Sequence, residues 1–432
     1  MSYFTSFVIV CFLIQATSTA PAIQPHLAPL DNGPGDPDSN AQLWDPVSPV
    51  IPEPTRGKLG ANILGPQNLD LEQQNADLLA PPTTDHGQVE NLKWPFSLSH
   101  TRLSDGGWSR QQNVDVLPAA TELAGKNYLI LEVVDDIHDR CKYALESSEL
   151  HWHKTAEGEV RISTMTPEGQ IFVGDVSEGD LWYLPAGNPH SIQAKNTTKD
   201  GAEFILIFDS GKFAEDATFL LTDWLAHVPK GVLAKNFGVT DLTSFEHIPE
   251  KELYIFPSVP PPEDPTADMV IPNNTPNPYV FPLSKSKPTK TPGGSVKLVD
   301  SRTFKVAEKI SAVEVVVEVG GMRELHWHPT EPEWTFYISG EARVTIFASE
   351  ANAHTFNFQA GDVGYVPPTY GHYIENTGNT TLKFLEVFQG GIVQDISLTQ
   401  WLALTPPSLI KAHLGFSDEL IGKLSRVKQE VV

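Results

Sequence analysis

The sequence predicts an all-β protein built from two barrels of one kind, each followed by short helices. The main reason is a repeat: GDLWYLPAGNPHSI (179–192) matches GDVGYVPPTYGHYI (361–374). Most of the repeated segments are short alternating or β-branched runs bounded by Gly, Pro, Asn or Asp, as strands are. One further pair, residues 222–238 and 399–415, matches without a gap and spaces its apolar residues helically.

The start of the chain predicts a secretory signal peptide over residues 1–20. An apolar run from Phe7 to Ile14 is followed by small polar residues that end at Ala20. The alternative is an N-terminal membrane anchor, but the run is too short to span a bilayer comfortably. No later segment is apolar enough to cross a membrane, so we expect a secreted protein with no membrane partner.

Two segments rich in proline divide the rest of the chain. Residues 21–90 have no sustained period and are interpreted as a tail or as an arm that wraps a neighbour. Residues 257–293 are similar and are interpreted as a linker, because proline removes the backbone donors that sheets and helices need. The two barrel domains are therefore expected at 91–256 and 294–432.

Charge and cysteine content exclude several classes of protein. The formal net charge of −24 would repel the phosphates of nucleic acid, so no nucleic-acid partner is expected. Cys11 would leave with the signal peptide and Cys141 would then be alone, which excludes a disulfide framework. Sequons at Asn196, Asn273 and Asn379 agree with export and predict a glycoprotein.

The second copy contains a candidate metal site. In the run HWH, His326 and His328 are two residues apart on a predicted strand, so their imidazoles lie on the same face. Glu333 and His372 follow at positions where a stack of hairpins can bring them to the same place. Such a set of nitrogen and oxygen ligands without thiolate suits Mn or Fe and disfavours structural Zn. For a single histidine a satisfied core or surface position is the simpler interpretation, but the spacings recur in both copies.

The paired units, ELHWH followed by E, GD, P and H, resemble the two motifs of the bicupin family. The similarity to fungal-type oxalate decarboxylases extends over about residues 91–432. It implies two cupin barrels of the double-stranded β-helix or jelly-roll type, secretion, and a homo-oligomer, trimer or hexamer. It also implies manganese sites, and conversion of oxalate into formate and carbon dioxide with dioxygen as co-catalyst.

The resemblance also implies which residues act. Eight metal ligands carry over by motif position: His151, His153, Glu157 and His190 in the first barrel, and His326, His328, Glu333 and His372 in the second. Arg323 matches the arginine that polarises bound oxalate, although a structural salt bridge is the alternative. Glu386 stands in the apolar run FLEVF where the first copy has Leu206. Its buried carboxyl is expected to have a raised pKa and to donate a proton, or else to pair with Arg323.

A loop in the first copy, residues 209–219, matches the active-site lid of the family. The family reads Ser-Glu-Asn-Ser where this chain has Ala214-Glu215-Asp216-Ala217, so the glutamate is retained and its hydroxyl neighbours are lost. Glu215 would deliver a proton to the substrate carbon and favour formate. The alternative is a solvated acidic loop.

The first copy is damaged between its motifs. Glu157 and His190 are 33 positions apart, whereas Glu333 and His372 are 39 apart, so six residues that match WTFYIS are missing after Glu157. Twelve extra residues precede the motif, and Ser148 stands where the second copy has its arginine. Six residues are about 20 Å of strand, so an open wall is expected beside the first site.

Two explanations of this damage remain open. One is real divergence, and the other is misjudged intron boundaries on both sides of the motif, which the paired insertion and deletion favour. In either case the first site is impaired, and we expect about one metal ion per chain. Two other functions also remain open: an oxalate oxidase that makes hydrogen peroxide, and a storage-type bicupin without catalysis.

Overall fold

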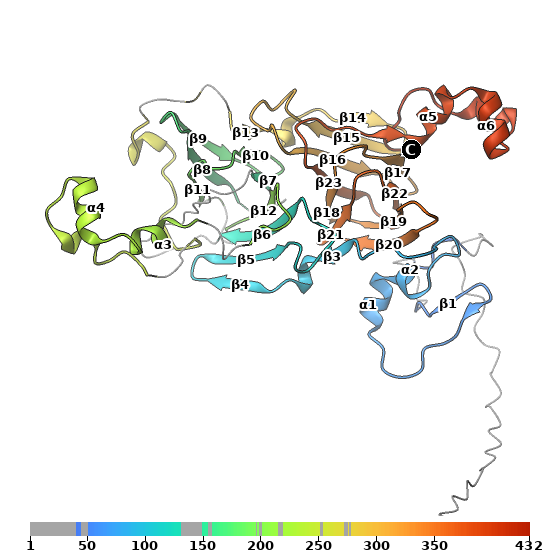
Figure 1. Ribbon diagram of the computed structural model, residues 1–432, viewed down its shortest axis with the longest axis horizontal. Coiled ribbons are helices and arrows are strands. Elements are labelled where there is room, and N and C mark those ends of the chain that lie inside the picture. Colours follow the sequence, from blue (N-terminus) through green and yellow to red (C-terminus); the bar gives the residue numbers. More distant parts are fainter. Residues whose placement is uncertain are drawn as a thin grey trace, which may run out of the picture.

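The computed structural model places two β-barrels side by side, with helices at the outer end of each (Figure 1). It describes residues 40–44, 51–130, 149–153 (backbone only), 158–195, 197, 201–214, 219–250, 254–271, 275 and 278–432. The prediction of an all-β fold with short helices after each barrel is confirmed.

The first barrel is made of two antiparallel sheets. Its strands are β4 (Thr101–Ser104), β5 (Gly107–Gln112), β6 (Ala124–Ile130), β7 (Glu149–His153), β8 (Val160–Met165), β9 (Ile171–Val176), β10 (Leu181–Leu184), β11 (His190–Ala194), β12 (Ala202–Phe208) and β13 (Val280–Phe281). Within the described residues, the sheet orders are β13-β10-β7-β12-β6-β5-β4 and β11-β8-β9. Helices α3 (Leu221–Ala226) and α4 (Lys230–Phe237) follow.

The second barrel repeats this plan with more complete sheets. Its strands are β14 (Thr289–Thr291), β15 (Gly294–Val299), β16 (Ser311–Val317), β17 (Met322–Trp327), β18 (Glu333–Ser339), β19 (Glu341–Phe347), β20 (Ala353–Gln359), β21 (Asp362–Val366), β22 (Gly371–Asn376), β23 (Leu382–Phe388) and β24 (Ile396–Ser397). Together with β3 (Lys93–Pro95) they form sheets in the orders β14-β15-β16-β23-β18-β21-β3 and β20-β19-β22-β17-β24. Helices α5 (Leu398–Leu404), α6 (Pro407–Leu414) and α7 (Asp418–Lys423) follow.

Strand β12 of the first barrel is covered on both of its faces. All seven of its residues are buried. Phe204 and Leu206 pack inside the first barrel, whereas Ile205 and Ile207 join the hydrophobic core that extends into the second barrel. A strand covered on both faces needs no polar side, and β12 is apolar from Phe204 to Phe208, so alternation could not have predicted it.

The barrels exchange edge strands across the predicted domain boundaries. Strand β3, expected at the start of the first domain, pairs with β21 of the second barrel. Strand β13, from the predicted linker, pairs with β10 of the first barrel, and β14 of the same linker pairs with β15. Each exchanged strand covers a sheet edge whose backbone groups would otherwise lack partners.

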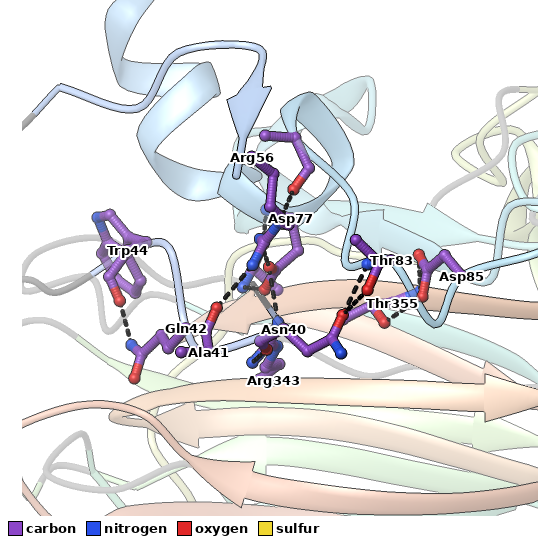
Figure 2. A network of polar contacts seen from close by, with 12 residues as sticks. Asn40, Ala41, Gln42, Trp44, Arg56, Asp77, Thr83, Asp85, Arg343 and Thr355 are labelled. Carbon is purple, nitrogen blue, oxygen red and sulfur yellow. Dashed lines mark hydrogen bonds and ion pairs between the residues drawn. The ribbon is translucent and has the colours of Figure 1, made fainter. Parts of the chain in front are cut away.

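The N-terminal arm packs on the outer face of the second barrel and contains short elements of its own. These are β1 (Thr55–Arg56), β2 (Leu59–Gly60), α1 (Leu69–Gln74) and α2 (Ala76–Leu79). Fully buried Asp77 accepts hydrogen bonds from Arg56 at 2.7 Å and from Arg343 of β19 at 2.9 Å, as Figure 2 shows. Asp85 is bonded to Thr355 of β20. The described part of the arm is therefore a strap held by buried ion pairs.

Strand β7 corrects the expectation of an open wall in the first barrel. Its backbone lies between β10 and β12, the place that β18 occupies between β21 and β23 in the second barrel. Glu149 pairs with Leu184 and Phe208, just as Glu333 pairs with Val366 and Phe388. The motif strand has thus filled the gap left by the missing strand, because the backbone groups of β10 and β12 need a partner.

No helix within the described residues is long and apolar enough to cross a membrane. The predicted signal peptide, Cys141, Asn196 and Asn273 lie outside the described residues. Asn379 is exposed in the turn between β22 and β23.

Candidate metal centre

Three strands of the second barrel bring the four predicted ligands together. Strand β17 carries His326, whose register partner across the ladder is His372 of β22. His328 follows directly after β17, and Glu333 is the first residue of β18 in the facing sheet. Their candidate ligand atoms all lie within 4.8 Å of one another, and all four residues are buried.

A carboxylate at the centre of the cluster faces the imidazoles. Oε2 of Glu333 is 3.0 Å from Nε2 of His328 and 3.2 Å from Nε2 of His372. Its other oxygen accepts a hydrogen bond from the hydroxyl of Thr335. Burial favours the neutral carboxyl, but the neighbouring His372 and His328 hold the pKa of Glu333 well below its usual range.

Backbone carbonyls orient the three imidazoles. Each Nδ1 lies within hydrogen-bonding distance of a carbonyl oxygen: that of Glu324 (2.7 Å from His326), Gln394 (2.9 Å from His328) and Tyr370 (3.0 Å from His372). A carbonyl can only accept, so each Nδ1 carries a hydrogen and each Nε2 faces the centre.

These residues fit a divalent metal ion. Nε2 of His326 is buried without a hydrogen-bond partner. Burial and the charge of Arg323 lower the pKa of His326 well below its usual value, so its imidazole is neutral. Neutral imidazoles and a carboxylate that converge on one point, without thiolate, are a donor set for Mn or Fe.

Arg323 lies beside this cluster on β17 and is ion-paired twice. Its Nη2 is 2.6 Å from Asp395, and its Nε is 3.4 Å from Glu386 of β23. Burial lowers the pKa of the guanidinium, but Glu386 and Asp395 outweigh it and raise the pKa above its ordinary value. The pairing between Arg323 and Glu386 that the sequence left open is therefore present.

Glu386 is a buried acid that combines this pairing with a raised pKa. Burial raises the pKa of its carboxyl to about 8, against the opposing effect of Arg323. The second carboxyl oxygen, Oε2, is buried without a hydrogen-bond partner. Glu386 can therefore hold a proton inside the barrel at neutral pH.

Comparisons with known proteins agree with this geometry. The cupin family model matches residues 147–243 and 281–421. Oxalate decarboxylase OxdC of Bacillus subtilis is 46% identical over 389 residues, which cover 88% of this chain and 97% of the relative. A probable oxalate decarboxylase of the fungus Arthroderma benhamiae is 38% identical over 385 residues, 86% of this chain and 91% of the relative.

The chain belongs to the bicupin oxalate decarboxylases. It is accordingly an enzyme of the carbon–carbon lyase class. A solved structure of a mutant of the Bacillus enzyme matches with a TM-score of 0.83 and 44% identity, and covers 89% of this chain and 99% of that one. Another, with the same score and coverage, comes from a study of the Mn(II) centres of that enzyme by EPR.

The described residues of the first barrel do not repeat the ligand cluster of the second. Buried His190 of β11 has its Nδ1 3.1 Å from the carbonyl of Asn188, as His372 has with Tyr370. The backbone of β7, which carries His151 and His153, lies in the other sheet and does not pair with β11. Glu157 and Glu215 lie outside the described residues.

A lysine distinguishes the interior of the first barrel. Lys126 of β6 is opposite Leu206 in register, where the second barrel has Val313 opposite Glu386. Its buried ammonium lies 4.5 Å from the ring centroid of Tyr128 and 4.8 Å from that of Tyr254. A fixed positive charge at this level opposes the binding of a cation. The described residues of the first barrel therefore do not fit a metal ion as those of the second do.

Sequence reasoning missed three charged residues near the two barrel interiors. Lys126 stands within a strand-like run, and its charge against an apolar pattern is a signal that was available. Asp395 and Lys428 were missed because they come close to Arg323 only through the fold, from segments distant in sequence. No local sequence pattern indicates such contacts. Asp395 contacts both Arg323 and Lys428, and together they hold its pKa at about 2 although burial alone would raise it.

Proposed function

We propose that this chain is a secreted, manganese-dependent enzyme that converts oxalate into formate and carbon dioxide in its second barrel, with dioxygen as co-catalyst. The observation that carries the proposal is the buried cluster of His326, His328, Glu333 and His372 beside Arg323. The names of its relatives, which match over nearly their full length, support oxalate as the substrate.

His326, His328, Glu333 and His372 would hold the manganese ion. When bound, the ion supplies a Lewis acid for a small dicarboxylate and a redox centre for dioxygen. The carbonyl contacts of the three Nδ1 atoms hold the ring planes in place, so the ligands need little reorganisation on binding.

Arg323 would bind the oxalate. Its guanidinium is planar and offers paired donors, which suits a planar dicarboxylate. Because the side chain is buried, its charge acts in a medium of low dielectric constant, where attraction for an anion is stronger than in water. Asp395 and Glu386 fix its position between them.

Glu386 would supply the proton that makes formate. The carbon–carbon bond of monoprotonated oxalate breaks, the carboxylate half leaves as carbon dioxide, and the other half keeps the electron pair and takes a proton from Glu386 at carbon. The acidic proton of oxalate then returns to Glu386, and formate leaves. With a pKa of about 8, Glu386 carries a proton at acidic and neutral pH and can deliver it inside the barrel. Glu215 on the lid of the first barrel is the alternative donor.

The first barrel would be a structural partner in this scheme, with about one manganese ion per chain. We also propose a homo-oligomer, trimer or hexamer, as the family resemblance implies. Exposure of Asn379 supports glycosylation at that residue.

The test is the product that manganese-loaded protein makes from oxalate. We expect formate and carbon dioxide in equal amounts, formed only when dioxygen is present and without its net consumption. Hydrogen peroxide with two carbon dioxides per oxalate would instead make the chain an oxidase. Metal-loaded protein that leaves oxalate unchanged would support the storage-type alternative.

A further inference from the structure

A segment far from the motifs completes the surroundings of Arg323. Residues Lys428–Val432 lie along β17 as an added edge strand. The backbone groups of Met322 and Val432 exchange two hydrogen bonds of 2.9 Å, and the amide of Glu324 donates to the carbonyl of Glu430 at 2.9 Å. Val431 forms an isolated bridge with Arg323 and is fully buried.

The same segment contacts the side chain of Arg323 directly. Its Nη1 donates to the carbonyl of Glu430 at 3.3 Å. Lys428 pairs with Oδ1 of Asp395, whose other oxygen accepts from Nη2 of Arg323 at 2.6 Å. Lys428 is also 3.2 Å from the carboxylate of Glu430. Asp395 is thus shared between two cations, only one of which lies inside the barrel.

The charges of this cluster decide how Arg323 meets an anion. Asp395 alone would neutralise Arg323 and hold it as a closed pair. Lys428 adds a second positive charge, which also offsets the carboxylate of Glu430 3.2 Å away, so the four charged groups together carry no net charge. Without Lys428 the two carboxylates would outweigh Arg323. Glu386 adds no negative charge while its pKa of about 8 keeps it protonated. A dicarboxylate approaches such a balanced group more readily than a group whose net charge is negative.

We propose that Lys428 is a positioning residue that acts through Asp395 to keep Arg323 available to an anionic substrate. The inference rests on the proposed function of the second barrel and deepens it. Lys428 does not touch the candidate metal ligands, so its removal leaves the metal site intact. Its contribution is expected in substrate binding rather than in the chemical step.

The experiment compares three variants of the full chain: K428M, K428R and K423M. K428M keeps the length of the side chain and removes its charge, whereas K428R keeps the charge. K423M is the matched control, because exposed Lys423 also pairs with an acid, Glu419, at 2.8 Å but lies on α7. Manganese content and thermal midpoint are measured for each, followed by KM and kcat for oxalate.

We expect K428M to raise KM about fivefold with kcat within about twofold, since one charge that acts on the anion through Asp395 and Arg323 is lost in a partly screened site. K428R should restore most of the affinity, and K423M should match the wild type. Equal KM values for K428M and K423M would overturn the proposal. Parallel loss of manganese and kcat in K428M would overturn it too, because that pattern belongs to a structural role.

A binding measurement separates this inference from the proposed function. Oxalate binding to manganese-loaded protein is followed without turnover, under anaerobic conditions, by the EPR signal of Mn(II). Fivefold weaker binding to K428M supports the inference even if the wild type releases no formate. Formate production by all variants with equal oxalate affinity supports the proposed function and rejects the inference.

Discussion

The two barrels differ in the strand that lies between two matching neighbours in the larger sheet, β7 in the first barrel and β18 in the second. Where the second barrel has β18 with Glu333 at its start, the first has β7 with Glu149 in the same register. In the part of the chain that the structure describes, the histidine strands β17 and β22 of the second barrel are neighbours, whereas β7 and β11 of the first barrel lie in different sheets.

The comparison shows that the fold tolerates the loss of one strand, whereas a metal site does not. A missing strand leaves backbone donors and acceptors unpaired, and another strand of suitable pattern can pair with them. A metal site requires particular side chains within about an ångström of one place, so a strand that moves to repair the sheet removes its ligands from the site. Leu206 in place of Glu386 agrees with this loss.

The largest expected effect is the difference in activity between two variants at matching histidines, one in each barrel. H372A should lower formate production by at least about a thousandfold, because it removes a metal ligand. H190A, at the matching position of the first barrel, should keep at least about half of the activity. Initial rates and manganese content of folded protein measure both. Comparable losses in the two variants would place catalysis in both barrels.

The next effect concerns two arginines at matching positions, Arg343 and Arg161, whose acidic partners differ in burial. D77A leaves Arg56 and Arg343 buried without their counter-ion and should reduce the free energy of unfolding by about 3 kcal/mol. D175N, beside Arg161 at the matching position, should lose roughly 1 kcal/mol or less, because Asp175 is 35% exposed. Urea denaturation provides both values. Equal destabilisation would show that the strap on the second barrel is no more deeply anchored.

The third effect tests Glu386, whose counterpart in the first barrel is Leu206. E386Q should lower kcat for formate by about a hundredfold, as expected for loss of a general acid. In the wild type, formate production should fall as the pH rises through about 8, where Glu386 loses its proton. A rate that E386Q leaves unchanged would assign the proton to another group.

The same variant has a signature in stability. The folded pKa of Glu386, about 8, is above its ordinary value of 4.5, so the folded state binds the proton more tightly. The contribution of this group to stability is therefore complete below pH 4.5 and declines as the pH rises toward 8. The E386Q variant has no proton to lose at this position, so its thermal midpoint should be close to that of the wild type below pH 4.5 and exceed it increasingly as the pH rises toward 8. Curves that stay parallel would contradict the raised pKa.

The smallest effect transfers the lysine of the first barrel into the second. V313K places a charge opposite Glu386, as Lys126 stands opposite Leu206, and should weaken manganese binding at least about tenfold by repulsion between cations. V313M, of similar length without the charge, is the control. Competition with a chelator measures the affinity. Equal affinities in V313K and V313M would show that the lysine has no part in the difference between the barrels.

Much of the fold and the second site could be predicted because their signals are local. Repeats, alternating strands and the spacing of His326, His328, Glu333 and His372 identified the barrels and the cluster. The exchange of β3 and β13 could not be predicted, since a strand of two or three residues pairs with whichever edge is within reach. The position of β7 could not be predicted for a related reason. A place in a sheet is filled by whichever strand competes best for it, and the first barrel lacks the strand that matches β18.

The central claim is that the second barrel alone holds the metal, and the metal content of purified protein tests it most directly. The wild-type chain should bind about one manganese ion, and H326A, which lacks one ligand of the second barrel, should bind close to none. Two tightly held ions in the wild type, or one that H326A retains, would contradict the account.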